Sequence, residues 1–304
     1  MPRRVSVKTG ERTIAESFQE YGRGVAGGLM FSLPLLYTME VWWAGFNSHP
    51  WRLVAYILAT FFLLLGYNRY AGLRHDASMT EVAIDSVEEL GIGFIIAAVS
   101  LFLLGRISFE MPAGEITGQI VIEAMTVAIG VSVGTAQLGG GGDGDEGVSG
   151  AGSSVQGRGG QAKEKRRGAT QDEPRFGGQL LLALCGATLF AANVAPTEEI
   201  VVIAVESSWT RLVALAFISL LFGSIILNYS EFRGTREFVR RDGFGSVVVG
   251  SIITYAVALF TSALVLWFFG RFDGVTLYTA LAETIVLGVA ATLGASAGRL
   301  LLQQ

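Results

Sequence analysis

Four glutamates stand inside long apolar segments of this 304-residue chain: Glu40, Glu123, Glu199 and Glu283. A carboxylate on a membrane helix is costly unless it has a partner, so each one needs a physical reason to be there. Carboxylates are ligands for hard cations. Burial disfavours their charged form, so such a group can exchange a proton for a cation near neutral pH. These residues predict ion or proton binding inside a membrane.

Smaller polar residues beside the glutamates can complete a binding site. The candidate ion- or proton-binding set adds Glu198, Thr38, Thr197 and Asn193 to the four glutamates. Pro34 and Pro196 each remove a helical hydrogen bond in the same regions. Broken backbone is tolerated at membrane depth only where protein or a water-filled cavity covers it. We therefore expect a polar cavity that opens to the outer face.

Four arginines near the predicted outer helix ends support a structural alternative: Arg52, Arg106, Arg211 and Arg271. Each could pair with one glutamate, and the pairs would then clamp helices together without binding an ion. The remaining acidic residues in or near the apolar segments are interpreted as solvated charges. They are Glu206, Glu81, Asp85, Glu88 and Glu89.

The second half of the sequence resembles the first. At a constant offset of 159 residues, five positions carry the same residue types: Phe31, Thr38, Glu40, Ser48 and Arg52 match Phe190, Thr197, Glu199, Ser207 and Arg211. The run 123–138 matches 283–298 at an offset of 160. We infer an internal duplication, with glutamates at corresponding places in both copies.

The composition is that of an integral membrane protein. Hydrophobic residues make up 51% of the chain and charged residues 16%, below the roughly 25% of soluble domains. The single cysteine, Cys185, excludes an intramolecular disulfide and is interpreted as packing. We expect the lipid bilayer and an inorganic cation or proton of unspecified identity as partners, and no cofactor and no nucleic acid.

The predicted fold is all-α and polytopic, with about eight transmembrane helices in two parallel four-helix repeats. The expected helices are 24–46, 51–67, 83–104, 116–138, 178–205, 210–227, 244–269 and 276–299. Residues 1–23 form a cytoplasmic N-terminal segment, and residues 139–176 form a Gly-rich cytoplasmic linker between the repeats 24–138 and 177–304. Lys and Arg are more frequent in the segments assigned to the cytoplasmic side than in those assigned to the outer side. This distribution predicts a plasma-membrane protein with both termini cytoplasmic.

Small residues recur at every fourth position of the fourth and eighth predicted helices: Gly130 and Gly134, then Ala290, Gly294 and Gly298. Such a pattern lets two helices approach closely. We expect these two helices to pack against each other across a pseudo-two-fold axis along the membrane normal. The alternative is that the same pattern forms the interface of a homo-oligomer.

The chain resembles a bacterial family of duplicated integral membrane proteins of unknown function. The resemblance rests on RGVAGGLMFSLPLLYTMEVWW in the first half, FAANVAPTEEIVVIA in the second, and the paired LLGR and FFGR turns. It covers most of the chain outside 1–22 and 139–176. It implies a membrane protein with an internal repeat and no defined activity.

The leading functional hypothesis is a cation transporter or channel that uses the intramembrane glutamates. A gated carrier is favoured, because below the glutamates the helices offer only hydroxyls and small residues. The alternative is a non-transporting scaffold, assembly factor or sensor with structural Glu-Arg pairs. An enzyme is not expected, because no Ser/His pair, His/Glu metal motif or paired aspartates occur at suitable spacing.

Overall fold

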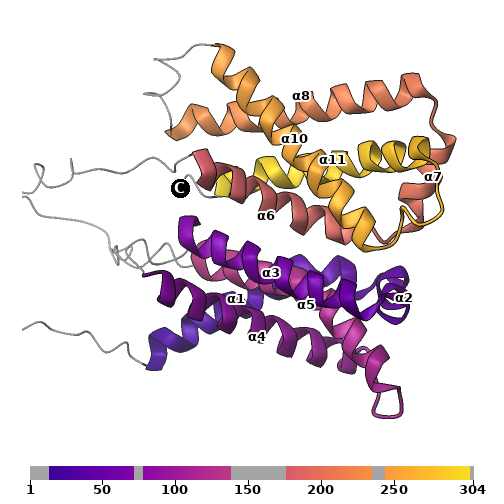
Figure 1. Ribbon diagram of the computed structural model, residues 1–304. Coiled ribbons are helices and arrows are strands. Elements are labelled where there is room, and N and C mark those ends of the chain that lie inside the picture. The colour runs from indigo at the N-terminus through magenta and orange to yellow at the C-terminus, as the bar shows by residue number, and fades with distance from the viewer. Residues whose placement is uncertain (1–13, 72–77, 138–175, 235–243, 302–304) are drawn as a thin grey trace, which may run out of the picture.

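The computed structural model describes residues 14–71, 78–137, 176–234 and 244–301. The predicted all-α class is confirmed for these residues, which form ten helices and no strand (Figure 1). The helices are α1 (Ile14–Leu36), α2 (Met39–Asn47), α3 (Pro50–Ala71), α4 (Met79–Leu103), α5 (Ala113–Gln137), α6 (Phe176–Val194), α7 (Glu198–Glu206), α8 (Trp209–Gly234), α10 (Phe244–Phe268) and α11 (Leu277–Leu301). The linker predicted at 139–176 lies outside the described residues, apart from the first residue of α6.

Seven of the described helices are long and apolar enough to cross a membrane: α3, α4, α5, α6, α8, α10 and α11. The predicted count of eight is not reached, because α1 does not meet this criterion. It begins at Ile14, ten residues earlier than predicted, and its first three turns carry Glu16, Glu20 and Arg23. Much of the apolar sequence assigned to the first span lies beyond its end, in α2.

Two predicted helices are broken in the structure. The predicted helix 24–46 is divided between α1 and α2, and the predicted helix 178–205 is divided between α6 and α7. Both bounds of α2 lie 159 residues before those of α7. Pro196 sits in the second break, where it cannot donate a helical hydrogen bond. Both short helices lie at the same end of the molecule (Figure 1).

Two long helices end in the same glycine turn. Gly105 follows α4 with φ +67°, and Gly270 follows α10 with φ +72°, a region that glycine adopts without steric cost. In each turn the amide of the next arginine donates to a carbonyl five residues earlier: Arg106 to Leu101 at 2.8 Å, and Arg271 to Leu266 at 2.9 Å. This pattern is the Schellman motif, which satisfies carbonyls at a helix end. The motif therefore fixes the backbone position from which each arginine side chain extends.

The glycine pattern packs helices within each half and not across the molecule. A Cβ atom added at Gly134 would lie 2.6 Å from the carbonyl oxygen of Arg23 in α1, and one added at Gly298 would lie 2.6 Å from that of Leu182 in α6. The predicted packing of the fourth helix on the eighth is therefore wrong for these glycines. The residues facing them on α1 and α6 are themselves small, including Gly27 and Gly186, so these pairs allow the closest approach.

We call α1–α5 the first half and α6–α11 the second half. Helix α6 joins them, because it packs against α1, α3 and α5 as well as its own neighbours. The Tyr56 ring of α3 stacks on Phe268 of α10 with centroids 4.0 Å apart, and the buried Cys185 thiol donates to the Leu63 carbonyl at 3.6 Å. The two halves share one hydrophobic core.

The arrangement of the halves differs from the expected pseudo-two-fold. A two-fold would place α8 against α1 in the way that α3 lies against α6. Instead α8 lies at the edge of the molecule farthest from the first half (Figure 1). Residue types agree with this difference, since Leu215 occupies the place in α8 that Tyr56 occupies in α3 at the offset of 159. The four glutamates therefore do not surround a common two-fold axis.

Candidate functional site

The helix packing brings Glu40 to the level of Glu123. Helix α2 packs on α5, and a Cβ atom added at Gly45 would lie 2.7 Å from the Gln119 amide nitrogen. Glu40 lies five residues before Gly45, and Glu123 lies four residues after Gln119. Because the two helices are antiparallel, these steps along the chain lead to the same level.

The second half repeats this relation. Helix α7 packs on α11, and the Tyr278 hydroxyl donates to the Ser207 carbonyl at 3.1 Å. Glu199 lies eight residues before Ser207, and Glu283 lies five residues after Tyr278. Both glutamates therefore lie on the same side of this contact. The glutamates thus occur as one pair of similar depth in each half, and no hydrogen bond joins them among the described residues.

Glu123 lies in the most enclosed part of the first half. It is 0% exposed and lies ten residues into α5, about 15 Å from its start. Neither of its carboxylate oxygens has a hydrogen-bond partner in the described part of the chain. Buried polar atoms are nearly always hydrogen-bonded, so an exception needs an explanation.

Two other buried polar groups lie near Glu123. Tyr56 of α3 interacts electrostatically with its carboxylate, and the Tyr56 hydroxyl also has no hydrogen-bond partner among the described residues. Gln119, one turn earlier on α5, is 2% exposed with an unpartnered side-chain oxygen. A carboxyl, a phenol and an amide are therefore held together in an apolar surrounding with hydrogen-bonding capacity unused.

Glu283 is equally buried but has a cation beside it. It is 1% exposed on α11, and the Arg271 guanidinium interacts electrostatically with it. The same guanidinium donates a hydrogen bond to the Pro196 carbonyl, at the break between α6 and α7. One guanidinium, that of Arg271, therefore interacts favourably with the C-terminal end of α6 and also partly offsets the negative charge of Glu283.

The remaining candidate glutamates lie in the first turns of the short helices. Glu40 opens α2 and is half-buried, whereas Glu198 and Glu199 open α7 and are exposed. A negative charge is favourable at a helix N-terminus, because the free amide groups there carry a partial positive charge. The structure places these three at the rim of the candidate site and places Glu123 and Glu283 inside it.

The candidate hydroxyl and amide residues hold the helix breaks. Thr38 donates to the Pro34 carbonyl at 2.6 Å, and Thr197 donates to the Val194 carbonyl at 2.9 Å. The Asn193 amide group donates to Leu189 at 2.6 Å and, across the two halves, to the Phe31 carbonyl at 3.3 Å. The Asn193 side-chain oxygen is buried without a partner among the described residues.

None of the outer arginines forms an ion pair with a candidate glutamate in the described part of the chain. Arg52 forms an ion pair with Asp273 of the other half at 2.8 Å. The Arg106 guanidinium lies 4.5 Å from the centre of the Trp42 ring, and Arg211 is exposed. Only Arg271 lies near a candidate glutamate.

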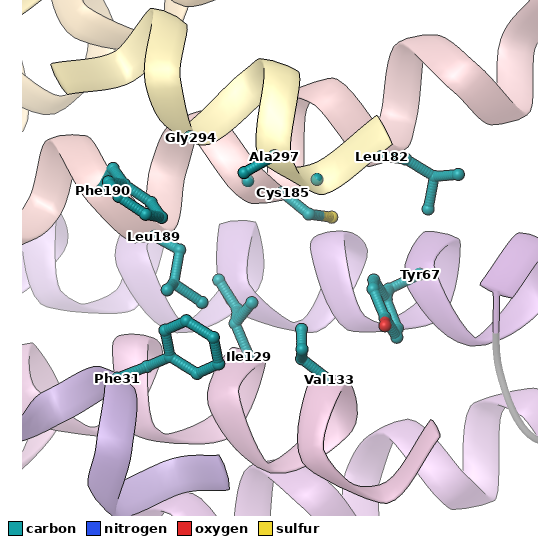
Figure 2. Close-up of a pocket in the computed structure, with 12 residues that line it drawn as sticks. Phe31, Tyr67, Ile129, Val133, Leu182, Cys185, Leu189, Phe190, Gly294 and Ala297 are labelled. Atoms are coloured by element: carbon teal, nitrogen blue, oxygen red, sulfur yellow. The ribbon is translucent and has the colours of Figure 1, made fainter. Parts of the chain in front are cut away.

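An apolar crevice lies between the halves, and none of the candidate glutamates borders it. It has a volume of about 30 Å³ and is bordered by α1, α3, α5, α6 and α11. Figure 2 shows Phe31 and Leu189 toward one end of it and Tyr67 toward the other. A space of this size holds about one water molecule, so it is too small for a substrate pocket.

Sequence comparison assigns the chain to a family. The family described as "Putative integral membrane protein (DUF2391)" matches residues 20–302. The protein belongs to this family. The function of DUF2391 is unknown, so membership confirms that this is an integral membrane protein and does not assign an activity. No curated protein and no solved structure matches the chain.

Sequence reasoning missed a buried polar cluster in this DUF2391 protein. Glu89 of α4, interpreted as a solvated charge, accepts a hydrogen bond from Asn68 of α3 at 2.7 Å. Asn68 is 8% exposed and also accepts from the Ser132 hydroxyl of α5 at 2.9 Å. The available signal was Asn68 itself, because an amide in an apolar segment requires hydrogen-bonding partners.

Proposed function

We propose that this protein is a membrane carrier in which Glu123 takes up and releases a proton during transport of a small inorganic cation. The observation that carries the proposal is the fully buried Glu123 carboxyl without a hydrogen-bond partner among the described residues. Ionisable residues within membrane spans are rare because they are expensive, and they commonly mark proton and ion pathways. A permanently unpartnered group with no role would only destabilise the fold.

The surroundings of Glu123 favour a proton over a divalent metal as the species bound. Calcium takes six to eight oxygen ligands, and magnesium takes six. The described residues contain no group of three or more His, Cys, Asp or Glu side chains that could hold a metal ion. A single carboxyl beside Tyr56 and Gln119 can hold a proton, which needs one oxygen only.

A non-transporting role is the second candidate, and the second half favours it. There the Arg271 guanidinium interacts electrostatically with Glu283 and donates to the Pro196 carbonyl, as in a structural clamp, although Glu283 Oε2 has no hydrogen-bond partner among the described residues. A scaffold or assembly factor would need such clamps in both halves. The first half lacks one at Glu123, so we propose a clamp role for Glu283 and a carrier role for Glu123.

The topology belongs to the same proposal. We propose two parallel repeats derived by internal duplication, with α1 as an eighth span, in the plasma membrane with both termini cytoplasmic. The common bounds of α2 and α7 at a shift of 159 residues support the duplication, and the excess of basic residues in the predicted inner segments supports the orientation. A single-cysteine labelling series in a Cys185→Ala background tests the orientation of each loop.

Flux measurement in liposomes tests the carrier proposal. Purified protein is reconstituted with a pH-sensitive dye inside the vesicles, and gradients of Na⁺, K⁺, Ca²⁺ and Mg²⁺ are imposed in turn. We expect one gradient to drive proton movement in the wild type and none to do so in Glu123→Gln. Glu206→Gln, which changes an exposed carboxylate at the end of α7, is the matched control and should retain wild-type flux.

Thermal stability separates the two candidate functions. A carrier predicts that Glu123→Gln folds normally, because the amide replaces a protonated carboxyl of similar shape. A structural role for Glu123 predicts a loss of folded protein on that substitution. Wild-type vesicles that show no proton movement under any of the four gradients would refute the carrier proposal.

A further inference from the structure

A second carboxyl of the first half, the half-buried Glu89, forms a polar cluster with the buried residues Asn68, Ser86 and Ser132. The Asn68 amide nitrogen donates to Glu89 at 2.7 Å and to the Ser86 hydroxyl at 3.2 Å. Its amide oxygen accepts from Ser132 at 2.9 Å. The Asn68 side-chain amide therefore joins three helices, α3, α4 and α5, and is hydrogen-bonded to the Glu89 carboxyl group.

One member of the cluster, Ser132, lies on the same helix as Glu123, but further from the end of the molecule that holds α2 and α7. Ser132 is nine residues after Glu123 on α5, which corresponds to about 13 Å along the helix. Tyr67, the neighbour of Asn68, borders the apolar crevice at the end remote from Phe31 (Figure 2). The first half thus has the buried Glu123 toward one end of the molecule and the half-buried Glu89 toward the other.

The second half has no such cluster among its described residues. At the offset of 159, Leu227 takes the place of Asn68, and at the offset of 165 that relates α4 to α10, Thr254 takes the place of Glu89. A cation lies in the corresponding region instead, since Arg299 of α11 donates to Thr254 of α10 at 2.7 Å and to Gln179 of α6 at 2.9 Å. A positive charge there repels a proton or a metal cation.

We propose that Glu89 is the inner proton-binding residue of a pathway that runs through the first half alone. This inference rests on the proposed function of Glu123 and adds the residue that exchanges its proton with the opposite side. The proton leaves the Glu123 carboxyl, which becomes a carboxylate, and the Glu89 carboxylate takes up one proton on the inner side. Ser132, which belongs to the Glu89 cluster, lies about 13 Å along α5 from Glu123, so hydroxyl groups or entering water must carry the proton between the two carboxyls.

The groups that face Glu89 set its response to pH. Asp85 and Glu88 on its own helix act on it electrostatically, while Asn68 and Ser132 provide hydrogen bonds from α3 and α5. A purely structural network would not need an ionisable member. An amide in place of the Glu89 carboxyl can still bond to Asn68, so Glu89→Gln separates the two roles.

The test is proton flux through Glu89→Gln in the liposome assay, with Glu206→Gln as the control at an exposed carboxylate outside the cluster. We expect Glu89→Gln to lower flux at least about tenfold while the unfolding temperature stays near that of the wild type. Undiminished flux in this variant, with flux in the wild type, would overturn the inference alone. Absence of flux in the wild type would refute the proposed function and this inference together.

A second variant covers the case in which Glu89→Gln does not fold. Glu89→Asp keeps the carboxyl group and shortens the side chain by one methylene. We expect a folded protein whose flux has a shifted pH profile, because the carboxyl keeps its chemistry but changes its distance to Asn68. A pH profile identical to that of the wild type would overturn the assignment of Glu89.

Discussion

The two halves of the molecule place an arginine after the same glycine turn and use it differently. In the first half the Arg106 guanidinium lies 4.5 Å from the centre of the Trp42 ring. In the second half the position matching Trp42 is Val201, which offers no aromatic face, and the Arg271 guanidinium donates to the Pro196 carbonyl instead. Since an aromatic face attracts a cation, one tryptophan accounts for the different placement.

This difference decides the electrostatic environment of the buried glutamates. Arg271 lies close enough to interact with Glu283, whereas Arg106 is held away from Glu123. The same backbone arrangement therefore supports one compensated and one uncompensated carboxyl. Under the proposed function, the compensated Glu283 serves the structure and the uncompensated Glu123 serves proton transfer.

The largest expected effect follows from exchanging the two glutamates for glutamine. Glu123→Gln should lower proton flux about 100-fold, because Glu40, which lies at the same level, is only half-buried and no other described carboxyl of the first half is buried there. Glu283→Gln should leave flux within about twofold, since its proton is not part of the pathway. Initial rates of vesicle acidification measure both. Equal losses in the two variants would refute the proposed division between the halves.

Removal of the two turn arginines should affect stability unequally. Arg271→Ala should lower the free energy of unfolding by about 3 kcal/mol, because it leaves the buried Glu283 without its cation. Arg106→Ala should cost about 1 kcal/mol, the contribution of an exposed cation-π contact. Denaturation in detergent micelles measures both. The double variant Arg271→Ala/Glu283→Gln should recover most of the loss, and failure to recover would show that Arg271 acts only through the Pro196 carbonyl.

The glycine contacts should respond in the same way in both halves. Gly134→Ala and Gly298→Ala each place a Cβ atom 2.6 Å from a facing carbonyl oxygen, so the helices must separate. We expect each to cost about 2 kcal/mol. Gly91→Ala on α4 is the control, because nothing lies within 4 Å of the added atom. A cost at only one of the two glycines would show that the halves differ in their packing as well as in their charges.

The smallest effect is expected at the ion pair that joins the halves. Arg52→Ala and Asp273→Ala should each cost about 0.5 kcal/mol, because Asp273 is largely exposed and water screens the interaction. A double-mutant cycle on thermal unfolding gives the coupling energy. A coupling above about 2 kcal/mol would mean that this pair, and not α6, is the main link between the halves.

The fold was predictable where the sequence pattern is local. Apolar segments identify the spans, and Gly105 and Gly270 mark helix ends because only glycine adopts their backbone angles without cost. The breaks before Glu40 and Glu198 were harder to place, since the proline signals a lost hydrogen bond and not the direction in which the chain continues. The partner of Gly134 was predicted wrongly, because a small residue shows that a helix approaches but not which one.

The site was predictable only in part for a related reason. Glu123 and Glu283 match in sequence, so their burial in corresponding helices could be anticipated. Their different charge compensation could not, because it depends on whether a distant position carries Trp42 or Val201. The hydrogen bond from Asn68 to Glu89 likewise depends on the packing of α3 on α4, which no short-range pattern specifies.

The position of α6 against three helices of the first half has a consequence for biogenesis. Synthesis proceeds from the N-terminus, so α1, α3 and α5 can assemble in the bilayer before α6 is made. Their joint surface, with Gly66 open to receive Leu181, then serves as the template on which α6 docks. The first half would then form the surface against which the second half assembles in the membrane.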